Sequence, residues 1–343
     1  MAKALIAMSG GVDSSVAAFL AMEQGFECCG GTMLLWDNGT SDAESVCARL
    51  GIPFHVFDGK QQFREQVVEP FIDAYEKGLT PNPCIFCNCH LKFLWLLDRA
   101  LELGCDYVVT GHYARIVQDE ATGRSLLCAA PDKNKDQSYF LAGLTQHQLS
   151  HTRFPLGELT KEQVRQIAQA QGFANARKKD SQDICFIPDG DYKAFMEKYT
   201  GKCYPCGHFL DESGKIIGQH KGAVGYTLGQ RKGLGLAMGI PVYVCGKDMV
   251  QNTVTVGSEA RLFARTLWAE NCNFIPFAAL SSPLRVTAKA RSRHNAQPAT
   301  VYPDEQGMRV EFDEPQRAIT PGQAVVLYDG DMVIGSGTIT CAK

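Results

Sequence analysis

The segment SGGVDSS at residues 9–15 constrains the fold of this chain more than any other feature. It lies between an apolar run at Lys3 to Ala7, which predicts a strand, and a stretch from about Val12 to Gln24 whose apolar side chains recur at helical spacing. At such a turn, unpaired backbone N–H groups and the helix dipole together favour a phosphate anion. The paired glycines let the main chain approach it closely. The segment therefore predicts a nucleotide site.

The side chains of this segment suit that role. Ser9, Ser14 and Ser15 add hydroxyl donors, and Asp13 can hold magnesium on the phosphates. The lysine of the GxxxxGK[ST] motif is absent, so transfer of a γ-phosphate is not indicated. The alternative is a glycine turn that only joins a strand to a helix. The hydroxyls, the acid and the strand–turn–helix context together favour the phosphate site over that alternative.

The first half of the chain alternates between strand-like and helix-like runs. Ser41 is a candidate N-cap, with Glu44 three residues later. The further runs are Thr32 to Trp36, Ser41 to Leu50, Phe54 to Phe57, Gln62 to Lys77, Cys89 to Leu103, Tyr107 to Thr110, Asp136 to Leu144 and Lys161 to Gln171. Such alternation predicts an α/β fold, a parallel sheet with helices on both faces. Two strand-like runs between Ala114 and Ala129 predict a hairpin inserted on that sheet.

After about Gly201 the pattern changes to short strand-like runs with frequent glycine, which is typical of a β-barrel. These runs are Gly222 to Gly239, Val242 to Gly246, Thr253 to Gly257, Arg285 to Ala290, Met308 to Phe312 and Ala324 to Tyr328. A length of 343 residues also exceeds what one hydrophobic core usually organises. We expect a catalytic domain with a helical extension at 1–200, a small central domain at 201–265 and a C-terminal barrel at 266–343.

The composition of the chain limits its cellular location, the state of its cysteines and its mode of nucleic-acid binding. No apolar run approaches the roughly 20 residues that span a bilayer, and no signal peptide precedes the first strand, so we expect a cytoplasmic protein with no membrane partner. Its 14 cysteines are then reduced thiols by default. A net charge of −3 argues against a protein that binds any nucleic acid through its overall field, although a local basic face stays open.

Two segments that carry cysteines call for a chemical role. Cys84 and Cys87 follow the rigid segment TPNP at residues 80–83 and precede a predicted helix, and a helix N-terminus stabilises a thiolate. Cys185 follows three cations, Arg177 to Lys179, by a few residues. The loop at residues 9–15 resembles that of the ATP pyrophosphatases, which split ATP into AMP and pyrophosphate to activate a carbonyl oxygen. Two activated thiols in such an adenylating enzyme suggest sulfur transfer.

At this point the resemblance becomes specific. The chain resembles the bacterial tRNA-specific 2-thiouridylase family (MnmA/TrmU), which carries an adenine-nucleotide α-hydrolase-like (PP-loop) domain and two small, mainly β domains. The matching segments are SGGVDSS, TPNPCIFCN followed by LKF, TGHYAR, KNKDQSYFL, FPLGEL, KKDSQDICFI, YTLGQRKGLG and TPGQAVVLY. They run from Met8 to Tyr328 in the family's order.

The resemblance implies roles by position. Cys87 would be the catalytic cysteine and Cys185 would carry a persulfide sulfur. The ATP site would comprise Ala7, Met8, Ser9, Gly10, Gly11, Val12, Asp13, Ser14, Met33 and Gly111. Asn82, Pro83 and Cys84 would face the target base. Contacts to the tRNA anticodon arm would come from His112, Lys135, Asp136, Gln137, Arg291, Ser292 and Gln323.

The implied reaction adenylates the C2 oxygen of the wobble uridine, and sulfur then displaces AMP to give 2-thiouridine. A sulfur-donor or sulfur-relay protein would load the persulfide on Cys185, and Cys87 would release the sulfur or complete a disulfide. Cys84 stands where the family commonly has aspartate. With Cys87 and Cys185 it could instead supply three thiolates to a [4Fe-4S] cluster with one open iron. Both sulfur routes stay open.

The sequence also allows other interpretations of single sites and of the function. Cys203, Cys206 and His208 suggest a zinc site, but zinc normally takes four ligands. His112 could be an ordinary buried polar residue. A cationic strand face is predicted from the alternation of Arg285, Thr287, Lys289, Arg291 and Arg293 with apolar residues. Rival functions are a PP-loop enzyme that adenylates a small metabolite for amidation or ligation, and a non-catalytic RNA- or metal-binding protein.

Overall fold

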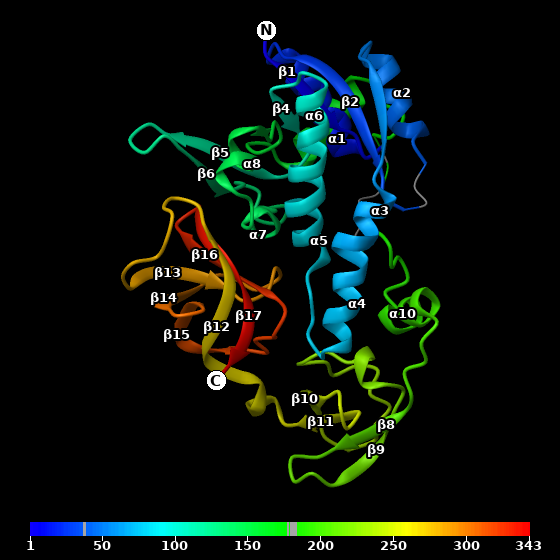
Figure 1. The fold of residues 1–343 in the computed structure, drawn as a ribbon, viewed down its shortest axis with the longest axis vertical. Coiled ribbons are helices and arrows are strands. Elements are labelled where there is room, and N and C mark those ends of the chain that lie inside the picture. The colour runs from blue at the N-terminus through cyan, green and yellow to red at the C-terminus, as the bar shows by residue number, and fades with distance from the viewer. Residues whose placement is uncertain (37–38, 177, 179–183) are drawn as a thin grey trace.

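The computed structural model describes residues 1–36, 39–176, 178 and 184–343. Its N-terminal part is built on a parallel five-stranded sheet in the order β3–β2–β1–β4–β7. Strands β1, β2 and β4 of this sheet lie near the N-terminus in Figure 1. The strands are β1 (Lys3–Ala7), β2 (Glu27–Leu34), β3 (Phe54–Asp58), β4 (Tyr107–Val109) and β7 (Thr152–Arg153). The predicted α/β class is confirmed.

Helices cover both faces of this sheet because β1 is apolar on both of its faces. Ala4 and Ile6 point into one core, shared with α1 (Val12–Glu23), α2 (Ser41–Leu50) and α9 (Lys161–Ala170). Leu5 points into the opposite core, shared with α6 (Leu96–Glu102). Successive residues of a strand face opposite sides of the sheet, so the buried residues Ala4, Leu5 and Ile6 contribute to the hydrophobic layers on both faces. Thr40, not Ser41, is the N-cap of α2.

Two long helical segments lead down from the sheet (Figure 1). The first joins α3 (Lys60–Phe63), η1 (Arg64–Val68) and α4 (Glu69–Glu76). The second joins α5 (Pro83–Phe86), η2 (Cys87–Trp95) and α6. It begins at Pro83 and not at Cys89 as predicted, because proline is well suited to a first helical position, where no N–H partner is needed. The segment CIFCNC therefore lies inside the helix.

The hairpin of β5 (Ala114–Asp119) and β6 (Arg124–Ala129) does not join the parallel sheet, so that prediction is wrong. It pairs instead with the C-terminal sheet, through Met332 opposite Cys128. Leu127 is fully buried in a cluster with Val326 and Val333 from the C-terminal strands. The alternation of apolar residues predicts that a hairpin forms. Which sheet the hairpin joins depends on where its apolar face is buried, and that is against the C-terminal strands.

Two other predictions of secondary structure are corrected. The stretch Asp136 to Leu144 contains one helical turn, α7 (Ser138–Leu141), followed by α8 (Gln146–Ser150) after a turn. The stretch Gly222 to Gly239 forms the short η3 (Ala223–Gly225) and loops, not strands. Gly222, Gly229, Gly233, Gly235 and Gly239 take positive φ angles, which suit turns and not an extended strand.

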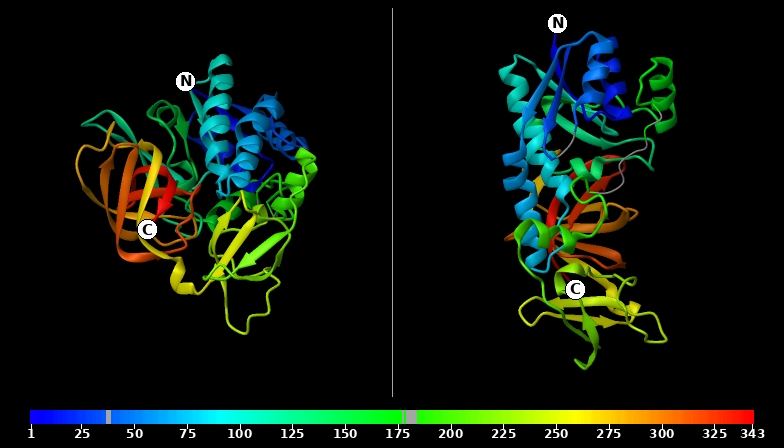
Figure 2. Two further views of the ribbon diagram at one scale, coloured as in Figure 1. Left: turned by 60° about the horizontal axis from the view of Figure 1, so that its bottom comes forward. Right: turned by 90° about the vertical axis from the view of Figure 1, so that its right-hand side faces the viewer.

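The C-terminal half forms two β units, joined by η4 (Glu259–Leu262) (Figure 2). The central unit follows α10 (Tyr192–Thr200) and has the strand order β10–β11–β8–β9, from β8 (Gly207–Leu210), β9 (Ile216–His220), β10 (Tyr243–Asp248) and β11 (Thr253–Gly257). The barrel comprises β12 (Phe263–Phe274), β13 (Leu284–Lys289), β14 (Gln297–Asp304), β15 (Gly307–Arg317), β16 (Ala324–Asp329) and β17 (Met332–Ala342). Pairing of β12 with β17 closes it, which confirms the predicted barrel. Within the described residues, no helix combines the length and the apolar character needed to cross a bilayer.

Candidate nucleotide and thiol site

The loop at residues 9–15 folds as a compact turn between β1 and α1. The hydroxyls of Ser14 and Ser15 both donate to the carbonyl of Gly11, at 3.0 Å. Gly11 is the N-cap of α1 and brings no side chain to cap it. Gly10 has a φ of 71°, and a Cβ there would lie 3.0 Å from the Cβ of Asp42. The loop thus leads into the first turn of a helix, the geometry that the predicted anion site requires.

The carboxylate of Asp13 is held by two residues that sequence analysis missed. The Nζ of Lys161, at the start of α9, lies 2.7 Å and 2.8 Å from its two oxygens. The hydroxyl of Tyr113 donates to its Oδ1 at 2.9 Å. Tyr113 belongs to the motif TGHYAR, which offered a signal, whereas nothing near Lys161 in the sequence pointed to a residue 148 positions away.

Asn175 is a third missed residue of this loop. Its Nδ2 donates to the carbonyl of Gly10 at 3.1 Å and to the hydroxyl of Ser15 at 3.0 Å. The residue is buried. Its amide thereby fixes the loop from the side of α9, since it follows that helix in the chain.

The structure brings the remaining expected ATP residues to the same end of the sheet. Gly111 lies directly on the loop, because a Cβ there would be only 2.6 Å from the carbonyl carbon of Asp13. Met8 follows β1, and its N–H donates to the carbonyl of Gly31 at 2.8 Å. Ala7 and Met33 end neighbouring strands and pack towards α6. Val12 is buried in the core of α1.

The three thiols of interest lie near one another but differ in exposure. Cys87 is 8% exposed, whereas Cys84 and Cys185 are exposed. Burial raises the pKa of Cys87 to about 11, and charges on Cys185 and Cys84 would raise it further, against a lowering effect of Lys92. Desolvation also raises the pKa of Cys84 and of Cys185. The predicted stabilisation of a thiolate by the helix N-terminus is therefore outweighed by desolvation.

The cations expected beside Cys185 do not form a described cluster. Lys178 pairs with Asp42 at 2.8 Å, beside the nucleotide loop. Arg177 and Lys179 lie outside the described residues. The activation of Cys185 by this run of charges is thus not supported for Lys178.

No metal site is formed by the side chains that the structure describes, since no three His, Cys, Asp or Glu residues are gathered as ligands. Cys84, Cys87 and Cys185 are therefore not gathered as a ligand group among the residues that the structure describes. The same finding applies to Cys203, Cys206 and His208, whose two thiols are exposed. The three residues are not arranged as a zinc site.

The expected tRNA contacts of the catalytic domain mostly support its own loops. His112 packs against Phe93 and Phe154, and its Nδ1 lies 2.6 Å from the hydroxyl of Thr110. Burial holds its pKa well below the ordinary value. Asp136 accepts from the N–H groups of Ala130 and Ser138, both at 3.1 Å. Gln137, which follows Lys135 and Asp136, accepts from the N–H of Tyr113 at 3.0 Å.

The expected contacts of the barrel lie where domains meet. Gln323 donates to the carbonyl of Thr80 at 2.7 Å, in the segment that precedes Cys84. Arg291 donates to the carbonyl of Leu228 at 3.0 Å and to the hydroxyl of Thr320. It is followed by the half-buried Ser292.

The predicted cationic strand is corrected. Strand β13 ends at Lys289, so Arg291 and Arg293 lie beyond it. Arg285 pairs with Asp313, and Arg291 is partly buried between domains. Ion pairing and burial therefore break the stripe that the alternation suggests.

Three family models match successive parts of the chain. They are the tRNA methyl transferase HUP domain at 2–189, the tRNA methyl transferase PRC-barrel domain at 193–258 and the aminomethyltransferase beta-barrel domain at 264–339. Together with the loop geometry, the first match defines a nucleotide-binding HUP-domain protein that carries two β domains.

Its sequence relatives are more specific. A tRNA-specific 2-thiouridylase MnmA from Clostridioides difficile is 46% identical over 98% of both chains. Another, from Acetivibrio thermocellus, is 47% identical over 98% of this chain and 99% of the relative. The chain belongs to the tRNA-specific 2-thiouridylase (MnmA) family of tRNA sulfurtransferases, which confirms the resemblance.

A solved structure described as the U34-tRNA thiolase NcsA from Methanococcus maripaludis with its [4Fe-4S] cluster is 18% identical. It covers 58% of this chain and 66% of its own, with a TM-score of 0.36. So remote a likeness does not bear on the sulfur chemistry of this chain.

Proposed function

We propose that this protein uses ATP to adenylate the C2 oxygen of the wobble uridine in tRNA and then replaces that oxygen with sulfur. The products are 2-thiouridine, AMP and pyrophosphate. One observation carries the proposal: a 2-thiouridylase-family chain keeps an intact phosphate loop together with Cys87 and Cys185, and a charge on Cys185 would raise the pKa of Cys87. The chemistry requires both parts, because the C2 oxygen is a very poor leaving group until adenylation turns it into AMP.

The nucleotide end of the site would work through the loop. Backbone N–H groups at the start of α1 and the hydroxyls of Ser9 and Ser14 would bind phosphate oxygens. Asp13 is the carboxylate that would hold Mg²⁺, which would neutralise charge on the phosphates. Gly111 and Gly10 let backbone approach backbone closely around the nucleotide.

For the sulfur step we propose the persulfide route. A sulfur-donor or sulfur-relay protein would load Cys185, and the terminal persulfide sulfur would attack C2 and expel AMP. Attack of Cys87 on the sulfur of Cys185 would then break the S–S bond, release 2-thiouridine and leave a Cys87–Cys185 disulfide. A low thiolate fraction on buried Cys87 would delay this attack. The three thiols are not gathered as a ligand group among the described residues, which favours this route over a cluster.

The partner proposed for the two β domains is the anticodon arm of tRNA. Asn82, Pro83 and Cys84 would face the target base, and the segment before them is tied to the barrel through Gln323. His112, Lys135, Asp136, Gln137, Arg291 and Ser292 remain the proposed tRNA contacts. The division at 1–200, 201–265 and 266–343 is the proposed domain organisation.

A reconstituted reaction tests the function. Purified protein with ATP, a persulfide donor and tRNA should release pyrophosphate and form 2-thiouridine, detected by mass spectrometry of digested tRNA. Pyrophosphate release that needs a small metabolite and not tRNA would favour a metabolite-adenylating enzyme. Binding of tRNA without pyrophosphate release would favour a non-catalytic protein.

Cys84 separates the two sulfur routes. Protein purified without oxygen should lack iron, and Cys84→Ala should keep its persulfide-dependent thiolation. If reconstitution instead loads about four irons per chain, supports thiolation without a persulfide donor and fails in Cys84→Asp, then the cluster route is correct.

A further inference from the structure

Two cysteine side chains outside the nucleotide and thiol site meet on one face of the parallel sheet. The Sγ atoms of Cys29, in β2, and Cys105, two residues before β4, are 3.8 Å apart. Both thiols are free in this structure. A disulfide has a sulfur–sulfur distance of about 2.05 Å, so each sulfur atom has to move by only about 0.9 Å to form one.

The backbone fixes the two residues on opposite sides of β1, because β2 and β4 are the two neighbours of that strand. Cys29 is paired with Leu5 in the ladder between β2 and β1. Cys105 precedes Asp106, whose N–H donates to the carbonyl of Lys3 at 2.9 Å. The carboxylate of Asp106 accepts from the N–H of Lys3 at 2.8 Å. A disulfide would therefore link β2 to the start of β4 across β1.

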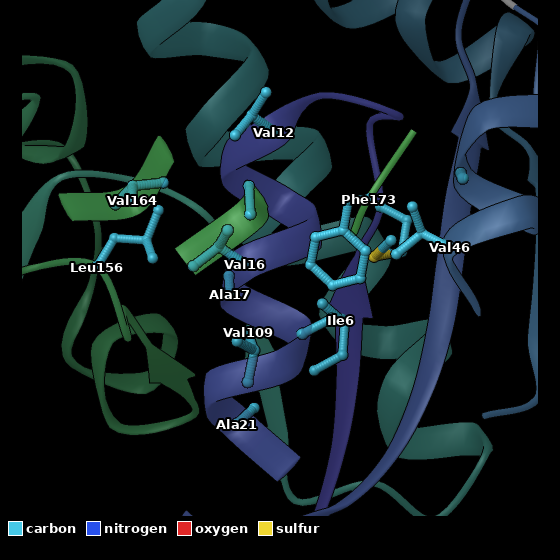
Figure 3. Close-up of a cluster of buried hydrophobic side chains, with 14 of the residues drawn as sticks. Ile6, Val12, Val16, Ala17, Ala21, Val46, Val109, Leu156, Val164 and Phe173 are labelled. Atoms are coloured by element: carbon cyan, nitrogen blue, oxygen red, sulfur yellow. The ribbon is translucent and has the colours of Figure 1, made fainter. Parts of the chain in front are cut away.

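Hydrophobic packing on both faces of the sheet keeps the two sulfur atoms together. On their own face, Cys105 lies in the buried cluster that contains Leu5, and Cys29 packs against this cluster. The opposite face is covered by the core under α1, in which Ile6 of β1 lies with Val109 of β4 (Figure 3). The three strands cannot separate without exposing apolar surface from both layers. The close approach of the two thiols is therefore built into the fold.

Exposure and charge decide how such a pair reacts. Cys105 is 6% exposed, whereas Cys29 is only partly buried, so a small molecule can reach the pair. Burial raises the pKa of Cys29 to about 12, and it also raises the pKa of Cys105. For Cys105, the hydrogen bond with Cys29 and the charge of Lys3 oppose this effect. Because thiolates react and thiols do not, we expect a slow reaction that begins at Cys105.

We propose that Cys29 and Cys105 are an oxidation site, at which hydrogen peroxide converts the two thiols into an intramolecular disulfide. This goes beyond the proposed function, since it uses neither ATP nor tRNA. The sulfur of Cys105 bonds to one peroxide oxygen, the O–O bond breaks, and the other oxygen leaves as hydroxide and takes up the proton that Cys105 released. The sulfur of Cys29 then attacks the sulfenic acid on Cys105.

The second step completes the balance. An S–S bond forms, the S–O bond of the sulfenic acid breaks, and its oxygen leaves as water with the proton of Cys29. The two thiols have together lost two electrons, and one peroxide has become two waters. The new bond joins positions that are 76 residues apart, so it restricts the unfolded chain much more than the folded one. The oxidised protein should therefore be the more stable form.

Peptide mapping of the purified full-length protein tests the proposal. Hydrogen peroxide is added until the exposed Cys185 is fully oxidised, the remaining thiols are blocked, and the protein is digested without reduction. Mass spectrometry should then find the peptide with Cys29 linked to the peptide with Cys105. Cys29→Ala should abolish this link. Cys28→Ala and Cys47→Ala remove thiols from the core on the opposite face and should keep it.

Thermal melting gives a second readout. Oxidised wild-type protein should melt roughly 3 °C or more above the reduced protein, and dithiothreitol should reverse the gain. In Cys29→Ala this part of the gain should be absent.

The mapping needs no variant, so the proposal can fail even if Cys29→Ala does not fold. Free Cys29 and Cys105 after full oxidation of Cys185, or a sulfinic acid on Cys105 beside a free Cys29, would overturn it. Failure of the protein to thiolate tRNA would refute the proposed function and leave this disulfide standing.

Discussion

At the scale of single residues, burial and charge compete for control of Cys87. Its sulfur lies in the apolar cluster that also holds Phe71 and Leu91. Lys92 is a nearby cation, but desolvation is the larger effect and raises the pKa to about 11. Because only the thiolate attacks sulfur, the free protein keeps this thiol unreactive near neutral pH.

The rate of alkylation by iodoacetamide measures the thiolate fraction of Cys87. Labelling of Cys87 should rise about tenfold for each pH unit between 7 and 10, because the thiolate fraction grows at that rate below the pKa. Labelling followed by site-resolved mass spectrometry should also find Cys87 slower than the exposed Cys185. A plateau of Cys87 labelling near pH 8 would contradict the raised pKa.

Sequence reasoning found the residues of the site that share a motif and missed those that do not. Asp13 and Gly111 were expected because each belongs to a recognisable segment. Lys161 and Asn175 reach the same loop from beyond residue 160. Their single side chains carry no local pattern, so only the packing of α9 on α1 reveals them.

At the scale of elements, the close contact between two loops makes a prediction about Gly111. A Cβ at this position would lie 2.6 Å from the carbonyl carbon of Asp13, with backbone atoms that cannot step aside. Gly111→Ala should lower ATP affinity at least about tenfold and cost on the order of 1–3 kcal/mol of stability. Isothermal titration and thermal melting measure the two effects.

Gly39→Ala is the matched control, because no atom of the described residues outside its chain neighbours lies within 4 Å of a Cβ built at Gly39. It should change neither quantity. If Gly111→Ala behaves like this control, the loop after β4 does not shape the nucleotide site.

Most helices and strands of the catalytic domain could be predicted from the spacing of their apolar residues, because each element buries one face against its neighbours in the same domain. Strand β2 is an exception, since it begins at Glu27, five residues before the predicted run Thr32 to Trp36. Strands β1, β3 and β4 and the helices α1, α2 and α9 were expected close to their observed positions. The partner of the β5–β6 hairpin was not, since it is chosen by contacts with strands about 200 residues away. The stretch Gly222 to Gly239 was predicted as strands but forms loops. Short apolar runs separated by glycines occur both in loops and in β-barrels, so the pattern does not distinguish them.

At the scale of the whole molecule, the central domain meets the catalytic domain around Gly78 and Lys247. A Cβ at Gly78 would lie 2.9 Å from Met249 and 4.0 Å from the Cε of Lys247. The Nζ of Lys247 is buried and makes no hydrogen bond with any residue that the structure describes. Burial lowers its pKa to about 8.

Lys247→Met should therefore stabilise the protein. Between pH 8 and the ordinary lysine pKa of 10.5 the unfolded chain binds more protons at this site, so this lysine makes stability rise with pH. At pH 7 the variant should gain on the order of 1–3 kcal/mol, and the gain should shrink as pH approaches 10. Thermal melting of both proteins at pH 7 and 9.5 measures the difference. A gain of equal size at both values would show that charge is not the cause.

The pairing of β6 with β17 also sets an order of events during synthesis. On the ribosome, Cys128 emerges about 200 residues before Met332, its partner in the ladder. Until then the N–H of Ala129, which finally donates to the carbonyl of Asp331, belongs to an unpaired strand edge. The edge of β6 in the nascent catalytic domain therefore stays unpaired until β17 has been synthesised. A chain released before that point would expose a strand edge that can pair with another copy.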